Sequence, residues 1–120
     1  ALGLGAGWLI ARGRSNKNDD SIIVLDPEDF NKNMRKGQLI DMRPEDDWKK
    51  SKINGSRNFP KRSLGQQMYK VRSDLPVFLY QEKGYAQAKS LANKLSKKGF
   101  NPIYILRSGF EEWPYQKKES

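Results

Sequence analysis

The segment from Pro76 to Gly99 constrains the fold more than any other part of the sequence. Residues 77–80, VFLY, are apolar without alternation, which is typical of a strand covered on both faces of a parallel sheet. A short loop follows this strand, and a helix follows the loop. Gly99, as a residue in the left-handed conformation, and the two lysines before it predict where that helix ends. The apolar positions at the spacing of one helix face are Ala88, Leu91, Ala92 and Leu95.

The loop at residues 81–85 lies between this strand and this helix, at the carboxyl edge of the predicted sheet. Ligands of open α/β folds bind at this edge, and backbone N–H groups at a helix N-terminus favour an anion or a negatively charged nucleophile. The first loop position, where a nucleophile would stand, is Gln81. An amide has no ionisable proton and no nucleophilic atom, so this residue cannot attack a substrate.

Composition removes several classes of chemistry. The 120 residues are enough for one domain with one core. They include no cysteine and no histidine, which excludes disulfides, thiolate zinc sites, cysteine nucleophiles and histidine-based triads. The formal net charge of +9 makes nucleic acid, a phosphate-bearing ligand or an acidic membrane surface the partners to consider.

Short apolar runs alternate with helical patterns along the rest of the chain. This alternation predicts a parallel sheet with helices on both faces. Strands are predicted at residues 22–25, 39–43, 57–59 and within 100–106, and helices at 27–36, 44–50, 63–72 and 110–115. The side chains expected to face the core from the helices are Phe30, Met34, Trp48, Phe110 and Trp113. The domain is predicted to span residues 21–116, followed by a polar tail at residues 117–120.

Asp41 lies within an apolar run and is followed by Arg43. A buried carboxylate is costly without a partner, so we expect Asp41 to accept from nearby backbone N–H groups or to pair with an arginine. A catalytic acid is the alternative. We favour the structural role, because no second carboxylate or histidine is spaced to work with Asp41.

Residues 1–20 form an apolar, glycine-rich segment followed by a polar linker. As a helix, residues 1–11 would reach only ~16 Å, whereas a bilayer core needs ~30 Å. The cations that follow, Arg12, Arg14 and Lys17, suit a cytoplasmic flank, and Trp8 suits a membrane interface. We therefore expect the inner end of a longer membrane anchor, with the domain on the cytoplasmic side. A disordered arm or a cloning remnant is the alternative.

Three stretches in order resemble the signatures of rhodanese-like domains. Residues 39–60 are similar to the family's LIDVR…EY…GHIPGAINIP, and residues 79–88 to its active-site loop YCRSGNRSA. Residues 99–113 are similar to its closing GF…VY.L.GG…W. The resemblance covers residues 21 to about 115, and it implies a three-layer α/β/α sandwich on a five-stranded, mainly parallel sheet.

The chain departs from this family at the loop. Gln81 stands where the family's persulfide-forming cysteine would be, and Ala86 where the family has an arginine that neutralises the transferred group. Sulfur transfer needs a thiolate, and no other cysteine is present to supply it. The resemblance therefore implies a non-catalytic member without thiosulfate sulfurtransferase activity and without a cofactor.

Three hypotheses remain for this loop, whose residues are Gln81, Glu82, Lys83, Gly84, Tyr85 and Ala86. In the first, the Gln81 amide fills the cradle, its oxygen accepting from N–H groups and its NH2 donating to a carbonyl, while Glu82 and Lys83 present opposite charges at the mouth. In the second, the loop is an anion site helped by Lys83. In the third, it is retained only for folding.

The function expected from these observations is a tethered module that binds a protein partner or a small ligand. A nucleic-acid binder is disfavoured, because the lysines are scattered and no groove-reading motif accompanies them. Binding of anionic lipid explains the charge equally well. An unrecognised enzyme using Asp41, Glu82 or Glu45 is the remaining alternative.

Overall fold

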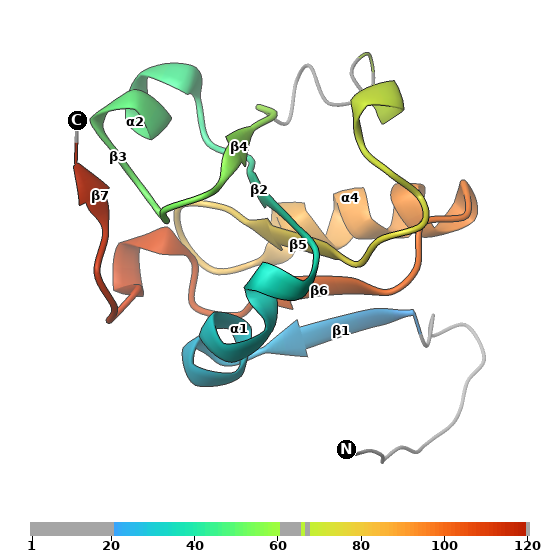
Figure 1. Cartoon of the computed structure of the whole chain (residues 1–120), viewed down its shortest axis with the longest axis horizontal. Helices are drawn as coiled ribbons and strands as arrows, with labels where there is room; N and C mark the ends of the chain where they lie inside the picture. The colour runs from blue at the N-terminus through green and yellow to red at the C-terminus, as the bar shows by residue number, and fades with distance from the viewer. Residues whose placement is uncertain (1–20, 61–65, 67, 120) are drawn as a thin grey trace.

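The central element of the computed structural model, which describes residues 21–60, 66 and 68–119, is a five-stranded sheet (Figure 1). Its strand order is β1-β6-β5-β2-β4, and every pairing between neighbours is parallel. The strands are β1 (Ile22–Leu25), β2 (Gln38–Asp41), β4 (Arg57–Asn58), β5 (Val77–Tyr80) and β6 (Ile103–Leu106). The predicted α/β class with a five-stranded parallel sheet is therefore confirmed.

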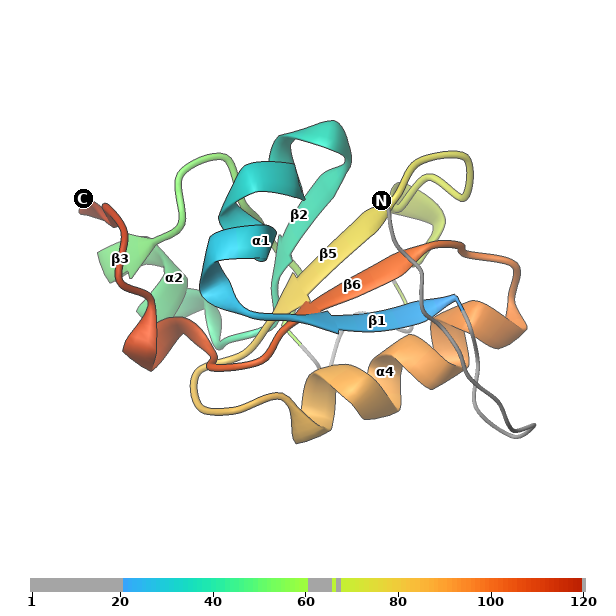
Figure 2. The ribbon, with the colours of Figure 1, turned by 90° about the horizontal axis from the view of Figure 1, so that it is seen from below.

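Helices cover both faces of this sheet, as Figure 2 shows with α1 on one side and α4 on the other. Helix α1 (Pro27–Asn33) continues as the 3-10 turn η1 (Met34–Lys36) and buries Phe30 and Met34. Helix α4 (Ala86–Lys97) buries all four residues of the predicted apolar face, and Gly99 has a φ of +97°. The repeat of apolar positions was sufficient to orient both helices.

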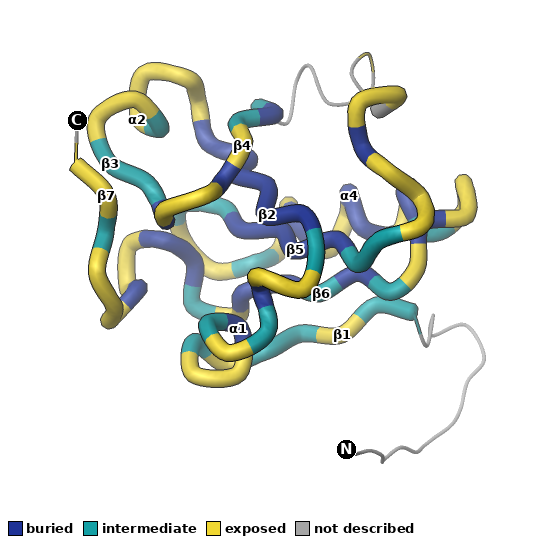
Figure 3. Tube along the Cα trace, in the orientation of Figure 1, coloured by how far each residue is buried: buried dark blue, intermediate teal, exposed yellow. Residues whose placement is uncertain are grey.

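The core consists of two clusters, one on each face of the sheet. Side chains of β5 alternate between them: Val77 and Leu79 pack with α4, whereas Phe78 and Tyr80 pack with Phe30 and the C-terminal segment. All four β5 residues are buried, and this strand runs through the middle of the dark region of Figure 3. Burial on both faces explains why β5 is apolar without alternation.

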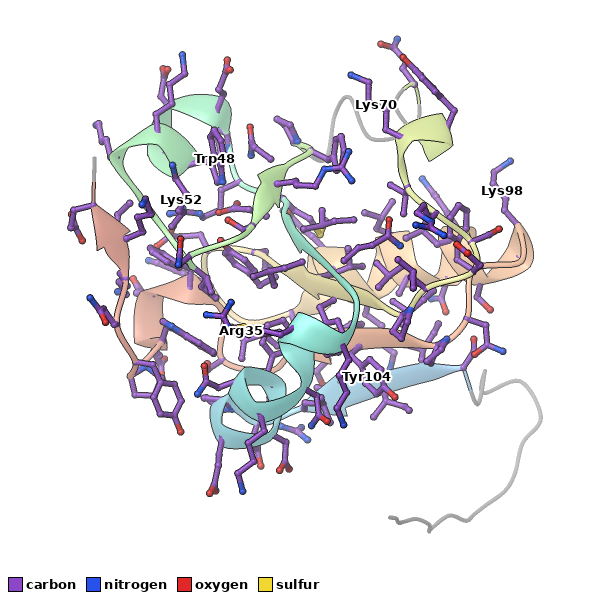
Figure 4. All side chains as sticks on the ribbon, in the orientation of Figure 1. Arg35, Trp48, Lys52, Lys70, Lys98 and Tyr104 are labelled. Carbon is purple, nitrogen blue, oxygen red and sulfur yellow. The ribbon has the colours of Figure 1, made fainter. Side chains whose placement is uncertain are left out.

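Trp48 is not the core anchor that the sequence predicted. Helix α2 (Glu45–Lys50) has Pro44 as its N-cap and buries none of its residues. The indole N–H of Trp48 donates to Ser56 Oγ at 3.0 Å, and Lys52 Nζ lies 4.0 Å from the ring centroid (Figure 4). The ring lies half-buried in a polar setting, which suits an aromatic side chain with a polar end.

The C-terminal segment differs from its prediction in two ways. Instead of a helix over 110–115 there is a single 3-10 turn, η3 (Phe110–Glu112), because Pro114 disfavours the helical conformation at the residue before it. Phe110 and Trp113 are nevertheless buried as predicted. The tail prediction is wrong, since β7 (Lys118–Glu119) pairs antiparallel with β3 (Ser51–Lys52).

Two predicted segments lie wholly or partly outside the described residues. Of the helix expected at residues 63–72, the structure describes residue 66 and residues 68–72. This part includes the 3-10 turn η2 (Met68–Lys70), and Val71 is buried. The N-terminal segment at residues 1–20 is not described. Among the helices that the structure does describe, none combines the length and the apolar character needed to cross a membrane.

Candidate functional site

Asp41 and Arg43 form a buried ion pair at the carboxyl end of β2, as the sequence predicted. Their side chains are 0% and 4% exposed, and Arg43 Nη2 lies 2.9 Å from Asp41 Oδ2. The Arg43 Nε also donates to both carboxylate oxygens, and the backbone N–H of Arg43 donates to Oδ1 at 2.7 Å. Arg43 alone therefore supplies three donor nitrogens to the carboxylate, and a free catalytic acid is not present at this position.

Tyr80 completes the cluster from the neighbouring strand β5. Its hydroxyl donates to Asp41 Oδ2 at 2.6 Å and accepts from the backbone N–H of Ile53 at 3.2 Å. Burial raises the pKa of Tyr80 well above its ordinary value, and the adjacent Asp41 charge and hydrogen bond add to this effect. Burial alone would lower the pKa of Arg43, but the hydrogen bonds and charge of Asp41 raise it.

Arg43 also links this cluster to two other segments. Its Nη2 donates to the Ser51 carbonyl of β3, and its Nη1 lies 3.2 Å from Glu82 Oε1. The guanidinium carbon lies 3.9 Å from the ring centroid of Phe110. One buried cation therefore fixes the relative positions of β3, the loop and η3.

Gln81 uses both ends of its amide within the loop. Its Oε1 accepts from the backbone N–H of Ala88 at 2.7 Å, in the first turn of α4. Its Nε2 donates to the Lys83 carbonyl at 2.7 Å. These are the two kinds of hydrogen bond predicted for this amide. The N–H group that donates to Oε1, however, belongs to the helix rather than to the loop. The side chain thus caps an N–H group at the helix N-terminus.

The segment at residues 108–111 closes over the same loop. The N–H groups of Phe110 and Glu111 donate to the carbonyls of Gln81 and Glu82 at 2.8 and 2.9 Å, and Gly84 N–H donates to Ser108 at 3.3 Å. A Cβ atom at Gly109, whose φ is +79°, would lie 2.7 Å from the Glu82 carbonyl oxygen. The backbones are therefore in close contact, and only glycine fits at this crossing.

The two charged loop residues each have an ion-pair partner within the chain. Glu82 turns to Arg43, and Lys83 Nζ lies 3.6 Å from Glu111 Oε2. A hollow of about 630 Å³ adjoins the loop, and Lys83 is not among its lining residues. They are Gly84, Tyr85, Ala86, Lys89, Ser90 and Asn93. Ala86 is exposed at the first position of α4, where a longer cationic side chain would reach this hollow.

Sequence reasoning did not find the role of Tyr80 in this cluster, nor that of Ser56, whose Oγ lies 3.2 Å from the Tyr80 hydroxyl. Tyr80 is opposite Asp41 in the parallel pairing of β2 with β5, so its role depends on strand order. A tyrosine as the last residue of a buried apolar strand indicates a polar partner nearby, because a buried hydroxyl requires a hydrogen-bond partner.

The chemistry available at this site is limited. Among the described residues, no group of three histidine, cysteine, aspartate or glutamate residues is placed to hold a metal ion. The loop offers an amide, a paired carboxylate and a paired ammonium group, and none of them is an activated nucleophile.

Known proteins share this sequence pattern and this fold. Residues 26–115 match the family described as Rhodanese-like domain. A protein of Bacillus subtilis (strain 168), named Uncharacterized protein YqhL, is 37% identical over 90 residues, which are 75% of this chain and 71% of that protein.

Two solved structures illustrate the similarity in fold. A rhodanese-related protein from Thermoplasma volcanium matches with a TM-score of 0.73 and 19% identity, over 80% of this chain and 97% of that one. The reduced CoADR-RHD of Bacillus anthracis matches with a TM-score of 0.69 and 22% identity, over 78% of this chain but only 16% of that chain. The sequence match over residues 26–115 shows that this chain belongs to the family of rhodanese-like domains, as a member without a cysteine.

Proposed function

We propose that this chain is a non-catalytic rhodanese-like module, which binds a protein partner or a small ligand and does not transfer sulfur. The observation that carries this proposal is the use of both ends of the Gln81 amide within the chain. An oxygen of the protein itself meets an N–H group at the helix N-terminus, which is where an anionic sulfur species would be stabilised. The loop then serves as structure, and a different surface serves for binding.

The chemistry of sulfur transfer supports the same proposal. A thiolate must attack the outer sulfur of thiosulfate, form a new S–S bond and release sulfite. This chain has no cysteine to supply the thiolate, and Ala86 supplies no charge to neutralise the transferred group. Thiol-based phosphatase chemistry fails for the same reason.

Purified protein tests this proposal in a thiosulfate–cyanide sulfurtransferase assay and by intact mass spectrometry. We expect no turnover above the protein-free rate and no added sulfur. The variant Gln81→Cys is the positive control, and we expect it to gain the mass of one sulfur atom after exposure to thiosulfate. Ser73→Cys, at an exposed position before β5 and so at the opposite end of that strand from the loop, is the matched control that should stay unmodified. Turnover by the unaltered protein would overturn the proposal.

We extend the proposal to a membrane tether, with the domain on the cytoplasmic side. Its support is the sequence alone: an apolar stretch at residues 1–11 followed by Arg12, Arg14 and Lys17. Flotation with liposomes tests it. The chain should float with the vesicles, whereas a chain beginning at Ser21 should stay in the soluble fraction. If both float equally, the domain surface rather than the N-terminal segment binds the membrane.

A further inference from the structure

A second concave site lies away from the loop, on the α1 side of the sheet. Its volume is about 600 Å³, within the range typical of small-molecule sites, about 300–1,000 Å³. It lies between η1, the turn at residues 53–54 and the C-terminal segment, and it shares no lining residue with the hollow beside the loop. The residues used below are Met34, Arg35, Ile53, Trp113, Tyr115 and Lys117.

Three buried side chains give this pocket an apolar part. Met34, Ile53 and Trp113 are 6%, 1% and 4% exposed, and all three belong to the core cluster on this face. Tyr115 packs edge-on to Trp113, with ring centroids 5.2 Å apart. The far wall is fixed by the pairing of β7 with β3. The pocket is thus formed by folded elements rather than by a free tail.

Cations outnumber carboxylates around the pocket. Arg35, Lys117 and Lys118 line it, against the single carboxylate of Glu119, which already accepts from Ser51 Oγ at 3.0 Å. Within the described part of the chain, none of the three cations has a carboxylate within 4.0 Å. Lys117 Nζ lies 4.5 Å from the ring centroid of Phe110, and Arg35 extends from η1 (Figure 4). This charge balance favours an anionic ligand.

Trp113 adds a hydrogen-bond donor. Its Nε1 is the one buried side-chain nitrogen or oxygen without a hydrogen-bond partner among the residues that the structure describes. An indole N–H only donates, so it requires an acceptor such as a carboxylate or carbonyl oxygen. Unpartnered buried donors are uncommon in folded proteins and mark positions that need a physical reason.

We infer that this pocket binds a small carboxylate with an apolar body, the apolar part against Met34, Ile53 and Trp113 and the carboxylate toward Arg35 and the lysines. The inference rests on the proposed binding function and gives it a site and a ligand class. The Nε1 atom is closed to solvent in this structure, so its N–H donates to the ligand only after a local rearrangement at the pocket. The size of the pocket, the three apolar side chains in its lining, the cations without a carboxylate partner and the unsatisfied donor all point to the same class.

The test uses 4-phenylbutyrate as the probe in an NMR titration of the ¹⁵N-labelled chain. We expect saturable shifts of the Trp113 indole N–H and of the backbone amides around Arg35, Asn54 and Lys117. The uncharged analogue 4-phenylbutyramide should bind at least about five-fold more weakly, since it loses the interaction with the cations. Inorganic phosphate, which has charge but no apolar body, should not compete.

Variants separate this pocket from general attraction to a basic protein. Arg35→Gln should weaken binding of 4-phenylbutyrate about five-fold, and Trp113→Phe, which keeps an aromatic ring but removes the N–H donor, about ten-fold. Lys98→Gln is the matched control, because Lys98 lies at the far end of α4 (Figure 4). No saturable shift up to about 10 mM, equal binding of the amide, or shifts centred on residues 81–86 would overturn the inference. Those results would leave in place the proposal that the chain does not transfer sulfur. Sulfurtransferase turnover would overturn the non-catalytic proposal and would leave the inferred ligand pocket in place.

Discussion

Arg43 and Arg35 lie in the same small domain, but their surroundings differ in burial and in hydrogen-bond partners. Arg43 is 4% exposed, and its guanidinium donates to Asp41, Glu82 and the Ser51 carbonyl. Arg35 is exposed, lines the pocket beside the C-terminal segment, and has no ion pair with any described residue. The first arginine is saturated by its own chain, whereas the second still has its hydrogen-bonding capacity available.

The same contrast separates the two regions that contain these arginines. Around loop 81–86, the described charges and the Gln81 amide are matched internally, which is how a polar network rigidifies a fold. Around the pocket, none of the three cations has a carboxylate partner among the described residues, and one indole N–H has no acceptor. Under the proposed function, loop 81–86 is structural in this member of the family, and the groups suited to binding lie elsewhere.

The largest expected effect is the loss of the buried ion pair. Arg43→Met leaves the Asp41 charge buried without its cation, and we expect a loss of about 3–5 kcal/mol in the free energy of unfolding. Arg107→Met is the matched control, because Arg107 pairs with Asp26 at the same distance of 2.9 Å but in an exposed position. The control should cost less than about 1 kcal/mol. Urea unfolding measures both, and equal losses would contradict the contrast between saturated and exposed pairs.

The second effect concerns the Tyr80 hydroxyl. Tyr80→Phe removes its hydrogen bond to the Asp41 carboxylate, and we expect a loss of about 1.5–3 kcal/mol at neutral pH. The raised pKa of Tyr80 also predicts a pH dependence. The unfolded chain releases this proton near pH ~10 while the folded chain keeps it, so stability is full below that pH and falls above it.

Unfolding experiments from pH 8 to 11 check the sign of this dependence. Above pH ~10 the unaltered protein should lose stability more steeply than Tyr80→Phe, which has no phenol at this position to titrate. Parallel curves for the two proteins would mean that Tyr80 ionises as easily in the folded state as in the unfolded one.

Local sequence patterns determined the parts of this structure that depend on near neighbours. The run VFLY predicted β5, and the helical repeat predicted which face of α4 is buried. The pairing of Asp41 with Arg43 was also predictable, because a buried carboxylate needs a partner and an arginine is two residues away.

The remaining features depend on contacts between distant segments. Tyr80 meets Asp41 only because β5 lies beside β2, and the sequence does not give the strand order. The two-residue strand β7 is too short to show a period, so its pairing with β3 was missed. Trp48 was misplaced because an isolated tryptophan marks burial without saying whether its partners are apolar.

A smaller effect is expected from removing the amide that caps α4. Gln81→Ala leaves the Ala88 N–H without its side-chain acceptor, and we expect a loss of about 1 kcal/mol. Gln87→Ala is the control, since Gln87 is exposed in the same helical turn, and it should change stability by less than about 0.5 kcal/mol. Thermal and urea unfolding measure both variants. If Gln81→Ala is as neutral as the control, the amide does not stabilise the loop and its position needs a different explanation.

The smallest effect on stability is expected at the other arginine. Arg35→Gln removes an exposed cation that pairs with no described carboxylate, so the free energy of unfolding should change by less than about 0.5 kcal/mol. With saturating 4-phenylbutyrate, however, the unaltered protein should gain stability, since a ligand that binds only the folded state stabilises it. Arg35→Gln should gain less at the same probe concentration. In the absence of the probe, Arg35→Gln could instead destabilise the protein nearly as much as Arg43→Met does. That result would place Arg35 in the saturated network and remove the contrast between the two regions.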